Sequence, residues 1–156
     1  MERKQVKAGQ TIIVKKIGSN ADIISALHYY MPYAIQQNQK RKFLFQGKTE
    51  KEICQSIWQF LKDNVKYVED SIYYQDIRLP NRLLKDRKGD CKSYAMFTAS
   101  LLKSLNIPCK LVYTSYTASK TPSHVYCQTD SGIIIDAVWN KFNSEKPYTY
   151  KYLKRI

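Results

Sequence analysis

Residues 88–105 read KGDCKSYAMFTASLLKSL, and this stretch decides the fold because it places a cysteine at the start of an apolar helix. Asp90 is a residue type favoured at a helix N-cap, and the helical spacing of apolar residues ends at Asn106 and Pro108. A helix N-terminus presents unpaired N–H groups and the positive end of the helix dipole, which favour a thiolate there. The position of Cys91 therefore predicts a nucleophile, although a free cysteine is more often a small core residue.

Two upstream segments also have helical periodicity. Residues 50–65 repeat apolar side chains at helical spacing behind a capping box formed by Thr49 and Glu52. Residues 21–37 begin with the same spacing, but Pro32 is expected to break or kink this helix. We therefore expect one full helix and one interrupted helix before the helix that begins at the cysteine.

Strand signals dominate the later part of the chain. They occur in residues 109–117, 123–129 and 132–138, and a weaker alternation occurs around residues 11–17. The connection over residues 65–90 is long for a passive loop, so we expect it to form walls of a site. Helices followed by an antiparallel meander predict an α+β fold.

The turn Asp-Ser-Gly at residues 130–132 sets the register of the last two of these strands. If it is a three-residue loop with its glycine in the left-handed conformation, Thr129 pairs with Ile133. His124 and Asp136 then become diagonal neighbours on one face, whereas a slip of one residue would separate them. An aspartate inside an apolar strand needs a partner, and the chain holds only 2 histidines.

A cysteine at a helix N-terminus, a histidine on a later strand and an aspartate on the next strand form the chain order of a nucleophile, a base and an orienting group. Gly-Asp-Cys at 89–91, the leucine-rich helix, Ile-Pro at 107–108, His-Val at 124–125 and the aspartate occur in that order. This arrangement, over about residues 50–140, resembles the transglutaminase-like superfamily. The segment VKYVEDSIYYQDIRLPNRLL at 65–84 resembles the one before the nucleophile in small bacterial and phage members.

The resemblance implies a papain-like core, in which the helix that bears the cysteine packs on an antiparallel sheet that carries histidine and aspartate. By position, Cys91 is then the nucleophile, His124 deprotonates it and later protonates the leaving group, and Asp136 holds the imidazole tautomer. Gln75 is the candidate for a second oxyanion donor and Trp139 for a wall of the site. A surface glutamine is the plainer interpretation of Gln75, and a core tryptophan explains Trp139 equally well.

The remaining cysteine and histidine side chains have plainer interpretations. Cys54, Cys109 and Cys127 are expected to be reduced structural thiols, and His28 is expected to be a half-buried helix residue. The cysteines lack the short paired spacing of a structural zinc site, and no calcium-loop pattern is present. We therefore predict no metal and no cofactor.

The length and the charge of the chain indicate its domain count, its compartment and its candidate partners. The 156 residues form about one domain, with no apolar run long enough for a membrane span and no signal-peptide pattern. We expect a cytoplasmic protein, associated with the virion if a phage encodes it. The net charge of +13 is concentrated in a basic N-terminal extension, residues 1–48, and a basic tail rich in Tyr and Lys, residues 141–156. These ends suit contact with an acidic protein or a polyanion, and solvated surface lysines are the plainer alternative.

The sequence predicts a thiol-dependent acyl-transfer enzyme that hydrolyses an amide bond in a protein or peptide. A fold does not determine the reaction, so cross-linking or deamidation of protein glutamine remains open. A non-catalytic scaffold or virion component, or a basic protein that binds polyanions, also remains open.

Overall fold

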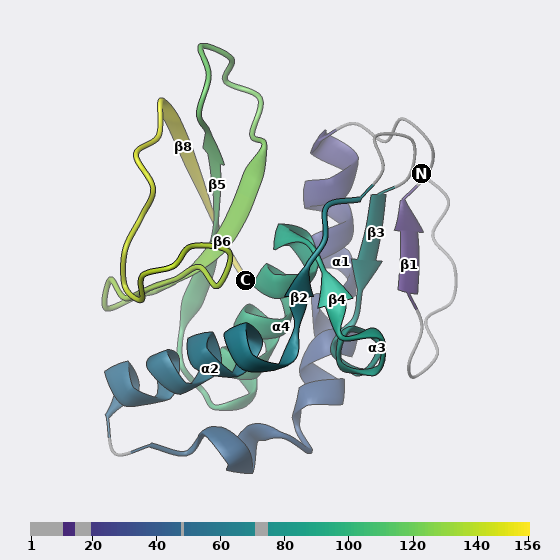
Figure 1. Cartoon of the computed structure of the whole chain (residues 1–156), viewed down its shortest axis with the longest axis vertical. Helices are drawn as coiled ribbons and strands as arrows, with labels where there is room; N and C mark the ends of the chain where they lie inside the picture. Colours follow the sequence, from purple (N-terminus) through teal and green to yellow (C-terminus); the bar gives the residue numbers. More distant parts are fainter. Residues whose placement is uncertain (1–10, 15–19, 48, 71–74) are drawn as a thin grey trace.

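The computed structural model describes residues 11–14, 20–47, 49–70 and 75–156 (Figure 1). The basic residues 1–10 and 15–19, and the end of the strand expected around 11–17, therefore lie outside the described residues. The elements, in chain order, are β1 Thr11–Val14, α1 Asn20–Asn38, the short 3-10 helix η1 Lys42–Phe45, α2 Glu50–Asn64, β2 Lys66–Tyr67, β3 Gln75–Arg78, α3 Pro80–Asp86, β4 Lys88–Gly89, α4 Cys91–Ser104, β5 Cys109–Ser115, β6 His124–Thr129, β7 Ile134–Ile135 and β8 Tyr150–Arg155.

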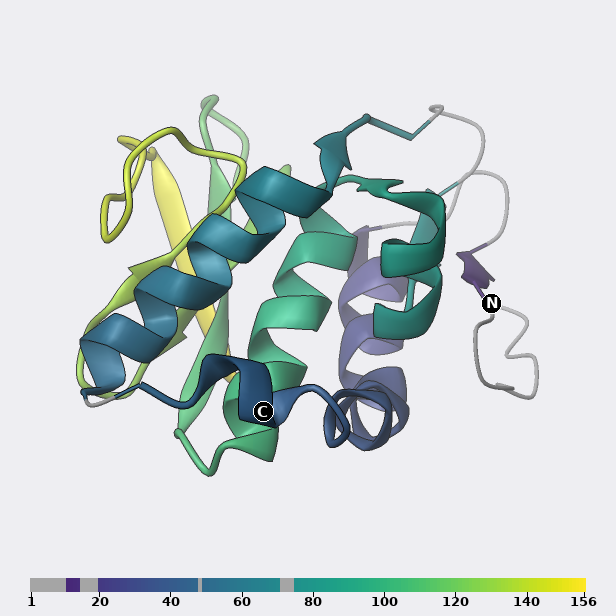
Figure 2. The same ribbon diagram turned by 60° about the horizontal axis from the view of Figure 1, so that its bottom comes forward.

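The fold is α+β, with an antiparallel sheet of order β7-β6-β5-β8 on one side and helices on the other. Helix α4 lies between the sheet and α1, and α2 crosses in front of α4 (Figures 1 and 2). There are two small strand pairs in addition: β1 and β3 lie beyond α1, on the side away from the sheet, and β2 and β4 lie where α4 begins. Within the described ranges, no helix combines the length and hydropathy that a membrane span requires.

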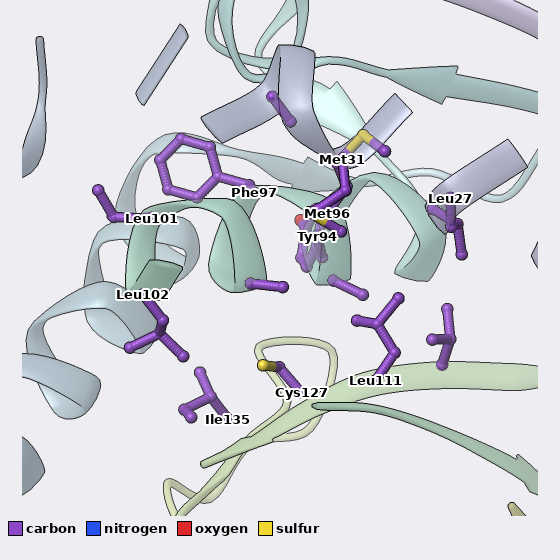
Figure 3. Close-up of a cluster of buried hydrophobic side chains, with 14 of the residues drawn as sticks. Leu27, Met31, Tyr94, Met96, Phe97, Leu101, Leu102, Leu111, Cys127 and Ile135 are labelled. Atoms are coloured by element: carbon purple, nitrogen blue, oxygen red, sulfur yellow. The ribbon is translucent and has the colours of Figure 1, made fainter. Parts of the chain in front are cut away.

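Helix α4 forms the centre of the core. Twelve of its 14 residues are buried, because the sheet covers one side of the helix and α1 covers the other. Figure 3 shows α4 between Leu27 and Met31 of α1 and Leu111, Cys127 and Ile135 of the sheet. A fully buried leucine or phenylalanine contributes about 2 kcal/mol, so this apolar stretch is the main stabilising element of the fold.

The hairpin between β6 and β7 has the predicted register. The Thr129 N–H donates to the Ile133 carbonyl at 3.0 Å, and Cys127 pairs with Ile135. Gly132 has a φ of +102°, a left-handed conformation that a side chain would strain. The three-residue loop at 130–132 is therefore confirmed.

The expected break at Pro32 is wrong, because α1 continues through it to Asn38. Pro32 is exposed, whereas its neighbours Met31 and Ala34 are buried. Tertiary packing of this helix outweighs the local cost of the proline, which removes one backbone donor and crowds the preceding turn.

The expected long loop over residues 65–90 instead contains β2, β3, α3 and β4. Helix α3 begins with Pro80 in its first turn and ends at Arg87, which has a φ of +53°. A left-handed residue that ends a helix is usually glycine, so the ordinary stop signal is missing here. The segment 141–156, for which the sequence analysis predicted no element, contributes the edge strand β8.

Candidate active site

The structure brings His124 and Asp136 together at one end of the sheet. His124 is the first residue of β6, and Asp136 directly follows β7. The His124 Nε2 atom lies 2.7 Å from the Asp136 Oδ2 atom, within the distance that the register predicted. Their side chains are 12% and 5% exposed, so the contact is shielded from water.

The position of Asp136 is held from several directions. Its Oδ1 atom accepts a hydrogen bond of 3.2 Å from the Val138 N–H, which leaves Oδ2 for the imidazole. Its backbone carbonyl accepts from the Trp58 indole N–H at 3.1 Å and from the Trp139 N–H at 3.1 Å. The sequence offers no local signal for the contact of Trp58 with Asp136.

The electrostatic surroundings of His124 favour its charged form. Burial by itself would lower the pKa of His124, but hydrogen bonds to Asp136 and Cys91, together with their negative charge, raise the pKa to about 10. Because Asp136 occupies Nε2, the Nδ1 atom is the one left for the Cys91 sulfur. The rings of Tyr116 and Tyr126 lie 6.0 and 5.6 Å from the imidazole, centre to centre.

Cys91 is the first residue of α4 and is partly exposed. The Asp90 side chain caps this helix by accepting from the Lys92 N–H at 3.1 Å. Gly89 lies in close contact just before the cap, since a Cβ there would come within 2.6 Å of the Leu83 side chain and 3.2 Å of Ser93, so that Leu83 would have to shift. Each residue of the Gly-Asp-Cys motif thus has a structural reason for its place.

A buried network of charges ties the segment before the nucleophile to α4. The Lys92 ammonium pairs with Asp90 and lies 3.3 Å from the Asp70 carboxylate. Asp70 also accepts a 2.6 Å hydrogen bond from the Asp76 N–H, next to Gln75. Although burial lowers the pKa of Lys92, its carboxylate partners raise it above the ordinary value, so this ammonium is charged and paired.

A pocket of about 230 Å³ opens beside the cysteine. Its lining includes Cys91, His124, Lys92 and Gln75, so the predicted oxyanion donor does face the same space as the nucleophile. Trp139 is not among the described residues that line it, and the indole nitrogen of Trp139 is buried without a hydrogen-bond partner among them. The geometry therefore places Gln75 at the pocket and Trp139 behind Asp136.

Comparison with known proteins identifies the family and the fold. The family model described as the transglutaminase-like superfamily matches residues 37–149. A search of curated proteins gives no significant match.

Two solved structures share the fold. One is a candidate cysteine protease from Cytophaga hutchinsonii, with a TM-score of 0.52 and 20% identity over 81% of this chain and 48% of that one. The other is a candidate protease from Parabacteroides distasonis, with a TM-score of 0.56 and 11% identity over 71% of this chain and 24% of that one. The chain thus spans less than half the length of either protein.

Proposed function

The chain belongs to the transglutaminase-like superfamily, and on this premise we propose that it is a thiol-dependent enzyme that hydrolyses an amide bond through Cys91, His124 and Asp136. The observation that carries the proposal is the 2.7 Å contact between His124 and Asp136, together with the pocket that Cys91 and His124 line in common. A nucleophile, a base and an orienting carboxylate in this order form the working unit of cysteine hydrolases.

The proposed reaction has two steps. The Cys91 thiolate attacks the carbonyl carbon of the substrate amide, and protonated His124 donates its proton to the leaving nitrogen as the C–N bond breaks. This step releases an amine and leaves a thioester on the sulfur. Water then attacks the thioester and gives a proton to His124, and breakage of the C–S bond releases the carboxylic acid and restores the thiolate.

Negative charge develops on the carbonyl oxygen in both steps. The backbone N–H of Cys91, at the N-terminus of α4, is one donor for this oxygen, and the side-chain amide of Gln75 is the second donor in our proposal. The charge network of Asp70 and Lys92 supports this arrangement, because it ties the segment of Gln75 to the helix that bears the nucleophile.

The test is incubation with a peptide library, with and without a primary amine, followed by mass spectrometry. Hydrolysis predicts products that gain water, whereas a cross-linker would attach the amine and a deamidase would convert glutamine to glutamate. The Cys91→Ala variant should lose all turnover.

Cys54→Ala, which removes a buried thiol on α2, is the matched control and should keep its activity at temperatures where it is folded. Product formation by Cys91→Ala at the wild-type rate would remove Cys91 as the nucleophile and reject the proposal. No product from the wild type would instead favour a scaffold or a binding protein.

A further inference from the structure

The pocket beside Cys91 has one predominantly apolar wall. Ile23 and Ile24 of α1, together with Val125 of β6, line the same pocket as the reactive groups. An apolar cavity of roughly 150 Å³ is known to hold a benzene molecule, so 230 Å³ is enough for one aromatic or branched aliphatic side chain.

The packing of α1 on the core holds this apolar wall in place. Helix α1 buries Leu27 and Tyr30 against the core, directly after the two isoleucines. At its other end, the buried Asn38 side chain donates to the Phe97 carbonyl at 3.2 Å and to the Ser100 hydroxyl at 2.7 Å, both on α4. Helix α4, which carries the nucleophile, therefore also holds α1 and the isoleucines of the pocket wall in place.

Apart from the reactive pair, Cys91 and His124, the charged or titratable side chains described in the pocket lining have partners or are neutral. The Lys92 ammonium is matched by Asp90 and Asp70. The Tyr113 hydroxyl lies 3.0 Å from the His28 Nε2 atom, and burial, with the nearby charge of Lys154, lowers the pKa of His28 to about 4, so His28 is neutral at pH 7. A charged substrate side chain would lose its water here without gaining a partner.

We propose that this pocket is a substrate subsite for one apolar side chain next to the scissile bond, and that Ile23 and Ile24 determine this preference. This inference rests on the proposed function and adds the substrate class. Both isoleucines precede residues 37–149, which the family model matches, so the selectivity comes from a part of the chain outside the shared core.

The test uses two alkylating reagents that differ by one carboxylate on the ring, N-benzyl iodoacetamide and N-(4-carboxybenzyl) iodoacetamide. The rate of Cys91 modification by each is followed by peptide mass mapping and divided by the rate for glutathione. Wild-type protein should react about tenfold faster with the apolar reagent, a ratio typical of a hydrophobic pocket. In the peptide library, Phe, Leu or Ile should then flank the cleaved bonds.

Two substitutions of Ile24 test whether the apolar wall sets the preference between the two reagents. Ile24→Lys should reverse the preference, and the milder Ile24→Ala should reduce it. Ile35→Lys is the matched control, because Ile35 is also a half-buried isoleucine of α1 that packs on the core, but it does not line the pocket. Ile35→Lys should keep the wild-type ratio.

Two results separate this inference from the proposed function. Equal normalised rates for the two reagents, with Cys91 still far more reactive than the other cysteines, would overturn the subsite and leave the enzyme intact. Cys91 reacting no faster than Cys54 would overturn both.

Discussion

The molecule contains two thiol regions that differ in almost every physical respect. Cys91 stands partly exposed at a helix N-terminus, beside an imidazole that is charged at neutral pH. Cys54, Cys109 and Cys127 are buried within the core, where α2 meets β5 and β6. Burial, together with Glu50 and Cys109, raises the pKa of Cys54 to about 12, and burial also raises the pKa of Cys127.

The buried thiols interact with one another and with backbone. The Cys109 sulfur donates to the Ala99 carbonyl at 3.8 Å, and Cys127 is hydrogen-bonded to Cys109. The comparison teaches that the same side chain is inert or reactive according to the charges and dipoles around it, so chain position alone does not identify a nucleophile.

The largest expected effect is a difference in alkylation rate between the two regions. At pH 7 a thiol with a pKa of about 12 is ionised to roughly one part in 10⁵, so Cys54 in the folded protein should react with iodoacetamide at least ~10³-fold more slowly than Cys91. Peptide mass mapping over time measures both rates. Equal labelling of the four cysteines in the native protein would erase the distinction between the regions.

The second-largest expected effect is a loss of turnover when Asp136 is replaced. Asp136→Asn should keep the fold but lower turnover by roughly 10²–10⁴-fold, since an amide can hold the imidazole in the wrong tautomer, as in the serine-protease example. Steady-state kinetics on the peptide found in the library, with circular dichroism as the check on folding, measures this. Full activity in the variant would remove Asp136 from the proposed machinery.

A pH titration of the two histidines tests how the surroundings of each side chain change its pKa. By NMR, the His124 imidazole should titrate near pH 10 and His28 near pH 4, on opposite sides of the ordinary value of 6.5. The sign follows from the neighbours, because a carboxylate favours the imidazolium, whereas burial near Lys154 disfavours it. Asp136→Asn should lower the pKa of His124 and leave that of His28 unchanged. A His124 midpoint near 6.5 in the wild type would contradict this account.

The smallest effect is expected in the buried cluster. Cys127→Ala should lower the free energy of unfolding by about 1–2 kcal/mol, because it leaves a small cavity between the sheet and α4. Urea denaturation measures this loss. The alkylation rate of Cys91 should not change, and a large fall in that rate would show that the two regions are coupled.

Short-range sequence patterns correctly predicted the start of α2 and the register of the hairpin between β6 and β7. The capping residue Thr49, which accepts from the Glu52 N–H at 3.1 Å, marks the start of α2 as expected. The glycine in the turn at 130–132 set the register of the hairpin, and hence the contact of His124 with Asp136. Pro32 was misleading because tertiary packing sustains α1 through it. The end of α3 had no local signal, because Arg87 rather than a glycine caps this helix.

The sequence alone determined the order of the candidate site residues along the chain. A cysteine at a helix N-terminus comes first, followed by a histidine and an aspartate whose register a short turn sets. These features depend on neighbours a few residues apart. Only the tertiary structure decided the surroundings of that chemistry: the contact of Trp58 with Asp136, the charge network at Lys92, and the wall formed by Ile23 and Ile24. The physical reason is that each of these contacts joins segments that are distant in sequence, and their positions follow from how the helices pack on the sheet rather than from any local pattern.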